Sequence, residues 1–505
     1  MEEKGNNPML QVKTLQSESK KVFEENQFLK MENSKVKKVS GSSSKHGNDL
    51  EEELKRKTKA IAEKRELQQC LCEFLDSKAS LSTFTLSLTQ HIPVPSQELS
   101  NQHPFLTTIN YLVSSSLARA RRLKNLNDNS SASISEIPLF PRGFGEYTVS
   151  LGFGSPSQKL SFIVDTGSSL VWFPCTPQYK CFNCTTPGIE PTKTPPFMPK
   201  LSSSAKILGC NDKKCDLVLA RKCNSKQNCS YHERYGSGMT SGFLLSETLH
   251  FPEGDVMDFA VGCSKLTTGI EEGIVGFGRG HESLPSQMGL KKFSYCLVSY
   301  NETVSSELVL FRDSSNSGAG EGDISYTKFR KNPVSPPYNV YYYLNLRKIT
   351  VGGKRVKIPY RFLVPQSDGN HHINGGTIID SGTTFTMMDS PIYDPVAKEF
   401  ENQMSMYQRV IYAESPDILC FDIGGKLPVF PELMFHFKGG AKLSLPMADY
   451  FEEVEPSKVC MTILSNGPAS GSGPSIIIGN IQQQNIYMEY DLENGRLGFK
   501  KKICK

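Results

Sequence analysis

The sequence lacks several features that would assign it to a common class. It has one tryptophan among 505 residues, and no apolar run approaches the roughly eighteen residues of a membrane-spanning helix. Its net charge is only +5, which gives no support for nucleic-acid binding. The first residues, Met-Glu-Glu-Lys, are not followed by the apolar segment of a secretory signal peptide. These absences disfavour a membrane-spanning protein and a nucleic-acid-binding protein.

The composition instead favours a large, β-rich enzyme or a chain of several domains. There are 40 glycines and 30 prolines, and Val, Ile, Thr and Tyr are frequent, as expected for many strands and turns. Hydrophobic residues make up 38% and charged residues 22%, which is compatible with a sizeable core. The length allows two to four average domains or one two-lobed enzyme.

Residues 1–78 differ from the rest of the chain. The segment Asp49–Leu75 is rich in Glu, Lys and Leu and has no Gly or Pro, so an amphipathic helix, at most a weak coiled coil, is predicted. It would either mediate self-association or partner binding, or be a solvated appended helix. The second interpretation is favoured because the heptad stripe is interrupted at Lys57, Lys64 and Gln68.

The next segment, 79–140, is polar and contains a basic run within Ser114–Ser131. This run is either solvated or an inhibitory segment that pairs with acids, and the sequence does not decide between them. From Gly145 onward, alternating strands and Gly/Pro/Ser turns are predicted, with a helix near Ser390–Met406 and an irregular loop at Arg312–Asp323.

Cysteine usage indicates an oxidising compartment. Cys70 and Cys72 lie in the charged N-terminal segment, and the β-rich body holds an even set of twelve. A disulfide framework is therefore predicted. Zinc is the alternative, because Cys181 and Cys184 form a CxxC pair, but the spacings that follow fit a zinc site poorly, and no metal is expected. The twelve are Cys175, Cys181, Cys184, Cys210, Cys215, Cys223, Cys229, Cys263, Cys296, Cys420, Cys460 and Cys504.

An internal repeat is the strongest signal of organisation. The motif Asp-Thr-Gly-Ser at 165–168 returns as Asp-Ser-Gly-Thr at 380–383, each time after an apolar strand. A hydrophobic-hydrophobic-glycine turn follows each copy, at Gly273–Gly278 and at Ser475–Asn480. Two similar lobes, each carrying one acid, explain this pattern.

Two carboxyl groups at the junction of two lobes can share one proton. When they lie about 3 Å apart, the repulsion between two negative charges prevents both groups from ionising. In acid, the carboxylate would take a proton from a water held between Asp165 and Asp380, and the neutral acid would protonate the substrate carbonyl. This chemistry needs no cofactor.

The residues that flank the acids suit this chemistry. Backbone N–H groups at Gly167 and Gly382 can approach the inner carboxylate oxygens, and the hydroxyls of Ser168 and Thr383 can donate to the outer ones. Thr166 and Ser381 can bond across the lobes and keep the carboxyl groups coplanar.

With two such motifs and their companion turns, residues 145–505 resemble the pepsin-type aspartic proteases. The resemblance implies a mostly β, bilobal fold with a substrate cleft between pseudo-symmetric lobes. "YGSGMTSG" (Tyr235–Gly242) resembles the family's flap hairpin, which assigns substrate contacts to Tyr235, Gly236 and Ser237. By the same resemblance, Trp172 hydrogen-bonds the flap tyrosine; plain core packing is the alternative.

The cysteine cluster and the lack of a saposin-like insert are similar to the plant nepenthesin-like subgroup. This resemblance implies the pairs Cys175–Cys181, Cys184–Cys263, Cys210–Cys229, Cys215–Cys223, Cys296–Cys504 and Cys420–Cys460. Glycosylation sequons at Asn129, Asn183, Asn228 and Asn301 fit secretion but also arise by chance.

The resulting hypothesis is an acid endopeptidase that acts on proteins or peptides and is cut from a zymogen near residue 140. Its protease part is expected to be monomeric. The predicted divisions are an N-terminal extension (1–78), a propeptide-like segment (79–140) and two lobes (141–320 and 321–505). The family suggests secretion to the apoplast or cell wall, or a vacuolar location, although the expected signal peptide is replaced by the charged helix. The alternative is a non-catalytic binding or inhibitor protein on the same fold; such proteins typically lose an active-site residue.

Overall fold

The computed structural model describes residues 83–90, 104–124 and 145–504, apart from 185–194, 219–220, 237, 252–253, 300–304, 313–323, 368–372, 414, 426–428 and 469–471. These residues belong to one compact unit, Ser82–Lys505. The predicted helix at 49–75, the cysteines 70 and 72, and the predicted cut near 140 lie outside the described residues. The division into four segments stays a prediction.

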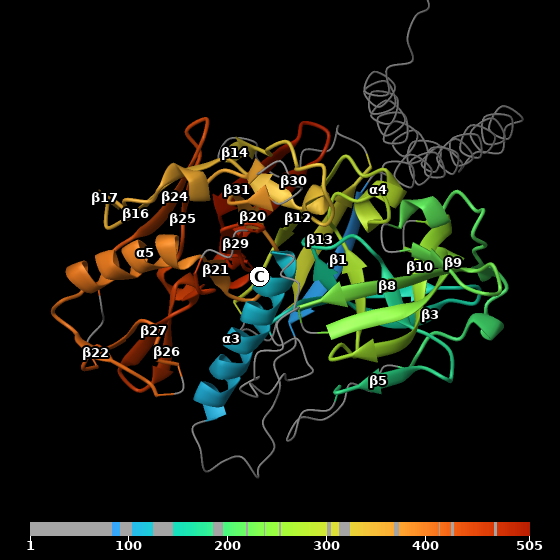
Figure 1. Cartoon of the computed structure of the whole chain (residues 1–505), viewed down its shortest axis with the longest axis horizontal. Coiled ribbons are helices and arrows are strands. Elements are labelled where there is room, and N and C mark those ends of the chain that lie inside the picture. Colours follow the sequence, from blue (N-terminus) through green and yellow to red (C-terminus); the bar gives the residue numbers. More distant parts are fainter. Residues whose placement is uncertain are drawn as a thin grey trace, which may run out of the picture. The chain divides into compact units, whose positions relative to one another are not determined.

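Most described strands form one large mixed sheet (Figure 1). Its order is β14 (Ser325–Lys328), β31 (Arg496–Lys501), β30 (Ile486–Asp491), β12 (Lys292–Cys296), β13 (Ser306–Phe311), β1 (Thr83–Gln90), β2 (Tyr147–Phe153), β3 (Gln158–Asp165), β11 (Gly273–Gly276), β4 (Trp172–Pro174), β10 (Val256–Thr268), β9 (Gly238–His250), β8 (Cys229–Tyr235) and β7 (Arg221–Cys223), with β5 (Lys180–Phe182) on β10 and β6 (Lys206–Ile207) on β9.

The second half of the chain builds smaller sheets from the described residues. One holds β15 (Tyr342–Leu344), β20 (Thr377–Ile379), β29 (Ile476–Ile478), β21 (Thr386–Met388) and β28 (Ile463–Ser465). The others are β17 (Lys354–Arg355), β16 (Leu346–Val351), β24 (Leu433–Phe437) and β25 (Lys442–Ser444); β22 (Gln408–Val410), β23 (Cys420–Asp422), β27 (Lys458–Met461) and β26 (Phe451–Glu455); and β18 (Gln366–Ser367) with β19 (Ile373–Asn374).

Three α-helices accompany these sheets in the described part: α3 (Pro104–Leu123), α4 (Leu284–Met288) and α5 (Ser390–Gln403). The predicted helix at 390–406 is α5, which ends three residues earlier. It buries Ile392, Val396 and Phe400, one residue per turn, so its apolar face packs on the lobe. None of the helices with described positions is both long and apolar enough to span a bilayer.

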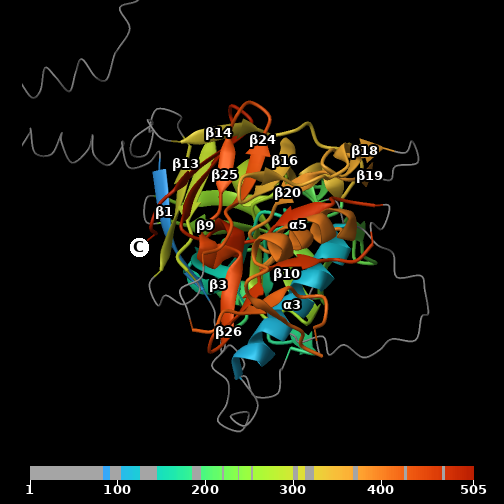
Figure 2. The same ribbon diagram turned by 90° about the vertical axis from the view of Figure 1, so that its left-hand side faces the viewer.

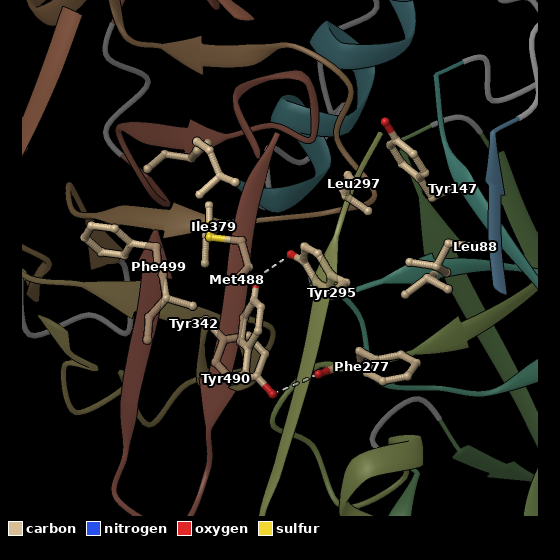
Figure 3. Packing of buried hydrophobic residues seen from close by; sticks show 14 of the residues in the cluster. Leu88, Tyr147, Phe277, Tyr295, Leu297, Tyr342, Ile379, Met488, Tyr490 and Phe499 are labelled. Atoms are coloured by element: carbon tan, nitrogen blue, oxygen red, sulfur yellow. Dashed lines mark hydrogen bonds between the residues drawn. The ribbon is translucent and has the colours of Figure 1, made fainter. Parts of the chain in front are cut away.

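The two halves meet across the pair formed by β12 and β30. The rings of Phe293 and Tyr490 stack with centroids 4.4 Å apart. The hydroxyls of Tyr295 and Tyr490 lie 2.9 Å apart (Figure 3). Tyr342 donates a hydrogen bond to the carbonyl of Phe277 at 2.9 Å. An aromatic cluster with hydrogen-bonded hydroxyl groups therefore joins the two halves.

Strand β1 and helix α3 both come from the segment that was predicted to be propeptide-like. β1 lies between β13 and β2, with Leu88 1% exposed. Figure 2 shows β1 at the left of the view beside β13, and α3 well apart from it, across the lower middle. In Figure 1, α3 lies between the strands of the two halves. One segment therefore contributes to both the sheet and the region between the lobes.

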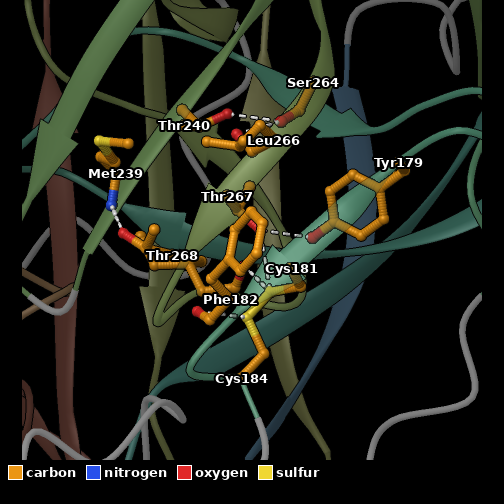
Figure 4. The surroundings of a disulfide bond; sticks show 11 residues. Tyr179, Cys181, Phe182, Cys184, Met239, Thr240, Ser264, Leu266, Thr267 and Thr268 are labelled. Carbon is orange, nitrogen blue, oxygen red and sulfur yellow. Dashed lines mark hydrogen bonds between the residues drawn. A yellow bond between two sulfur atoms is a disulfide. The ribbon is translucent and has the colours of Figure 1, made fainter.

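Six disulfides are present among the described cysteines, and they correct four predicted pairs. Cys175–Cys181 and Cys184–Cys263 are wrong: Cys175 bonds Cys263, and Cys181 bonds Cys184. The reason for the first is the parallel pairing of β4 with β10, which places Cys263 beside the end of β4. The CxxC segment closes on itself (Figure 4).

Cys210–Cys229 and Cys215–Cys223 are also wrong, because the structure exchanges their partners. Cys223 and Cys229 face each other across β7 and β8, so spacing alone does not distinguish them. Burial does: the buried Cys215 and Cys229 bond each other, and the exposed Cys223 bonds Cys210. The remaining pairs, Cys296–Cys504 and Cys420–Cys460, are bonded as predicted.

A buried acid in the second lobe generates the first prediction. Asp449 is 1% exposed, neither of its carboxyl oxygens has a hydrogen-bond partner among the described residues, and burial raises its pKa from 3.8 to about 8. The folded protein thus holds a proton that the unfolded chain releases between these pH values, so this group destabilises the fold as the pH rises from 4 to 8.

We expect Asp449→Asn to be increasingly more stable than the wild type above pH 4, by at most about 1.4 kcal/mol per pH unit. Urea unfolding at pH 4, 5.5 and 7 measures the difference. Asp394→Asn, on the exposed face of α5, is the matched control. A stability difference that does not change with pH would contradict the assignment.

Candidate active site

Two equivalent strand arrangements place the predicted acids. Asp165 ends β3, which runs parallel to β11 with Gly276 opposite Asp165. Asp380 directly follows β20, which runs parallel to β29. Both side chains are 0% exposed. The repeated sequence motif therefore corresponds to a repeated structure, as expected for two lobes.

The glycine of each hydrophobic-hydrophobic-glycine turn is required by close packing. A Cβ at Gly276 would lie 2.2 Å from the backbone of Ser169, and one at Gly479 would lie 2.5 Å from the carbonyl of Thr384. Each turn thus lets the loop that carries an acid pass directly against it. The companion turns position the acids.

Each carboxylate receives hydrogen bonds from its own motif. The N–H groups of Gly167 and Gly382 donate to Oδ1 of Asp165 and Asp380 at 2.8 and 3.0 Å. The Thr383 hydroxyl donates to Oδ2 of Asp380 at 2.6 Å, and the Ser168 hydroxyl donates to Oδ2 of Asp165. Such charge-assisted bonds stabilise a buried carboxylate.

Thr166 and Ser381, which stand between the acid and the glycine of each motif, form hydrogen bonds from one lobe to the other. The N–H of Ser381 donates to Oγ1 of Thr166 at 2.8 Å, and the N–H of Thr166 donates to Oγ of Ser381 at 3.0 Å. The Ser381 hydroxyl also donates to the carbonyl of Val164. This reciprocal pair fixes the two loops against each other, and serine serves in the second motif as well as threonine would.

Sequence reasoning did not identify the third charged member of the site. Arg119 of α3 lies between the acids: its Nε donates to Oδ2 of Asp380 at 2.8 Å, and its Nη2 donates to Oδ1 of Asp380 at 3.1 Å and to Oδ1 of Asp165. The Arg119 side chain is only 9% exposed. The signal was present in the basic run, but the sequence does not show which of its cations is buried.

Neighbouring cations of the same segment make further ion pairs. Arg122 Nη2 lies 2.7 Å from Oε1 of Glu233, and Lys124 Nζ lies 2.5 Å from Oδ1 of Asp389. Leu112, Ala120 and Leu123 add buried apolar contacts to the core of the second lobe. Within the described part of the basic run, Arg119, Arg122 and Lys124 pair with acids, whereas Arg121 is exposed. An inhibitory role of this segment stays a prediction.

The pKa values of the two acids move in opposite directions. Burial raises the pKa of Asp380, and the charge of Asp165 raises it further against the attraction of Arg119. Burial acts in the same sense on Asp165, but Arg119 and the Ser168 hydroxyl outweigh it and lower the pKa. Two coupled acids with separated titrations are the requirement for acid–base chemistry by a dyad.

A third carboxyl group lies near the dyad. Glu146 is 8% exposed, and its Oε2 has no hydrogen-bond partner among the described residues. Burial raises its pKa to about 8, and the charges of Asp165 and Asp380 contribute in the same direction. Glu146 therefore keeps its proton to a higher pH than an ordinary glutamic acid does, although the charge of Arg119 acts in the opposite direction. Sequence reasoning did not select it.

The predicted flap lies against the backbone of Arg119. Tyr235 ends β8, and Trp172 Nε1 donates to its hydroxyl at 3.0 Å. Trp172 is fully buried, so it both packs in the core and makes the hydrogen bond. Gly236 packs against α3, where a Cβ would lie 2.1 Å from Cα of Arg119. Ser237, the third predicted flap residue, lies outside the described residues.

The four predicted glycosylation sites differ in what the structure describes. Asn129 and Asn301 lie outside the described residues, Asn183 is exposed and Asn228 is partly exposed.

Comparisons with known proteins agree with this geometry. Residues 147–310 match the family model "Xylanase inhibitor N-terminal", and residues 341–501 match "Xylanase inhibitor C-terminal". Aspartic proteinase nepenthesin-2 from Nepenthes gracilis is 36% identical over 393 residues, which cover 76% of this chain and 84% of that protein. The chain belongs to the plant pepsin-like aspartic proteases.

Other members of this plant family and solved structures extend the comparison. Nepenthesin-1 from the same plant is 34% identical and covers 72% of the chain and 79% of that protein. The structure of edgp aligns with a TM-score of 0.58 at 18% identity, covering 84% of this chain and 95% of that one. Basic 7S globulin from soybean gives 0.54 at 18% identity, covering 71% and 91%. These structures confirm the predicted bilobal, mostly β fold.

The close approach of Gly236 to Arg119 generates the second prediction. Gly236→Ala should separate the flap from α3, because the added methyl group would overlap the backbone of Arg119. Hydrogen exchange of residues 112–124 in the full chain should become faster. Gly209→Ala is the control, since a Cβ there meets nothing closer than 3.8 Å. Unchanged protection would show that α3 does not depend on this contact.

Proposed function

We propose that this protein is an aspartic endopeptidase that hydrolyses peptide bonds in acid through a water activated between Asp165 and Asp380. The complete set of hydrogen bonds around two acids at one site supports this most directly. The lobe-crossing pair of Thr166 and Ser381 supports it further, since it holds the carboxyl groups in fixed relation. No cofactor takes part in the proposed reaction.

In this proposal the chain is made as an inactive precursor, and α3 is the inhibitory segment. Arg119 occupies the place between the acids where a water and a substrate carbonyl would have to bind. As the pH falls, Asp380 gains a proton before Asp165, because its pKa is raised and that of Asp165 is lowered. Arg119 then loses charge–charge attraction, which favours release of α3 and a cut near residue 140.

The disulfides and the plant relatives support a secreted or vacuolar protein. Self-association through residues 49–75 stays a prediction, as does a monomeric protease part. The alternative, a non-catalytic binding protein on this fold, is less supported because both acids and their hydroxyl partners are present.

The third prediction tests the catalytic dyad. Acid-treated wild-type protein should hydrolyse a denatured protein substrate with a maximum below neutral pH, and pepstatin should block it. Asp165→Asn and Asp380→Asn should each lose at least about a thousandfold in rate, because the proton exchange between the acids is abolished. Absence of hydrolysis by folded protein from which α3 has been cut away would favour the binding-protein alternative.

The fourth prediction tests inhibition by α3. In the full-length chain, Arg119→Gln should hydrolyse the substrate without the lag of the wild type, because the dyad loses its internal cation. Arg121→Gln is the matched control, since Arg121 lies two residues away on the exposed face of the helix. Progress curves at pH 4 to 6 measure the lag. A lag as long in Arg119→Gln as in the wild type would remove Arg119 from the inhibitory role.

A further inference from the structure

Two acidic sites flank the dyad, and cations of the α3 segment occupy both. The first, which we call the flap acid, is Glu233, whose Oε1 lies 2.7 Å from Nη2 of Arg122. The Arg122 guanidinium also lies over the ring of Tyr235, 4.7 Å from its centroid. This site therefore offers a carboxylate and an aromatic face to one cation.

The second site, which we call the Asp389 pocket, encloses a whole residue. Lys124 Nζ pairs with Asp389 Oδ1 at 2.5 Å, and both side chains are only 3% exposed. The hydroxyls of Tyr338 and Ser472 donate to the carbonyl of Lys124 at 3.1 and 2.7 Å. The pocket thus holds the side chain and the backbone of one basic residue.

These acids are not a consequence of an acidic protein. The chain carries a net charge of +5, so the carboxylates that gather around the dyad are a local feature. One short segment, 119–124, reaches the dyad, the flap acid and the Asp389 pocket together. A polypeptide that followed the course of this segment over the dyad would pass within reach of the same two acids.

Removal of α3 would leave both acids without their present partners. A buried carboxylate is costly unless a cation accompanies it, and this applies most to Asp389, whose side chain is 3% exposed, and less to Glu233, whose side chain is 25% exposed. A substrate with a lysine or arginine at the corresponding position would restore the pair, and a neutral side chain would not. The two carboxylates would therefore favour substrates with a basic side chain and disfavour substrates with a neutral one at these positions.

We infer that Glu233 and Asp389 select substrates, so that the active protein prefers polypeptides with Lys or Arg close to the scissile bond. The inference rests on the proposed function, because it concerns the same cleft after α3 has left. Glu233 and Asp389 act here by binding substrate side chains and take no part in the proton transfers.

Paired peptides test the inference with the wild-type protein. A neutral peptide that the acid-treated protein cleaves is resynthesised with Lys in place of Gln at each position near the cut. At two positions, kcat/KM at pH 5 should rise about tenfold or more, as expected for a cation that joins a carboxylate that is wholly or partly buried. Equal cleavage of all peptides would overturn the inference and leave the proposed function intact.

Variants assign the preference to the two acids. Asp389→Asn should bring the ratio of kcat/KM for the Lys peptide to that for the Gln peptide close to one at one position, and Glu233→Gln should do so at another. Glu401→Gln, a surface acid on α5 that pairs with Lys398 and Arg409, should keep the wild-type ratio. Wild-type ratios in both acid variants would overturn the assignment.

A binding measurement separates selectivity from catalysis. Asp165→Asn, freed of α3, should bind a labelled Lys peptide about tenfold more tightly than the Gln peptide in fluorescence anisotropy. This preference without hydrolysis by the wild type would support the inference as a binding property and count against the proposed function. Equal affinity would show that the two acids serve only to hold α3, which overturns the inference.

Discussion

The burial of two carboxylates at one point is the constraint on which the rest of the structure depends. Asp165 and Asp380 have no exposed surface, and two neighbouring negative charges in such a place repel each other strongly. The hydrogen-bond donors of each motif offset only part of the cost of burying a negative charge on each acid. A proton or a cation must supply the remainder, and in this structure Arg119 supplies it.

This constraint explains why the backbone segments around the two acids pack so closely against one another. Gly276 and Gly479 allow the two acid-bearing loops to lie against the hydrophobic turns, and the Thr166–Ser381 pair couples the loops to each other. The aromatic contacts between β12 and β30 then hold the halves that carry these loops. The positions of the two acids are therefore set by packing between segments that are far apart in the sequence. Their ionisation depends on the group that lies between them, which is Arg119 in this structure.

Features that depend on local spacing could be predicted from the sequence, and features that depend on how distant segments pack could not. The acids, their donors and the crossing hydroxyls are within three residues of each other in each motif, so local spacing was sufficient. The disulfide partners were not predictable, because Cys223 and Cys229 are side by side and only burial distinguishes their bonds. Arg119 was missed for a related reason: which cation of a basic helix becomes buried depends on how that helix docks, and Arg121 is exposed two residues away.

The segment that carries Arg119 is held in two physically different ways. At α3 the attachment includes the ion pair of Arg119 with Asp380, which weakens when Asp380 takes up a proton, because burial and the neighbouring Asp165 raise the pKa of Asp380. At β1 it depends on backbone pairing with β13 and β2 and on buried leucines, which acid does not remove. Acid therefore acts on one end of the segment and spares the other. In the proposed precursor, the cleft can open while the sheet stays complete, so the helix can leave the dyad before any part of the segment leaves the protein.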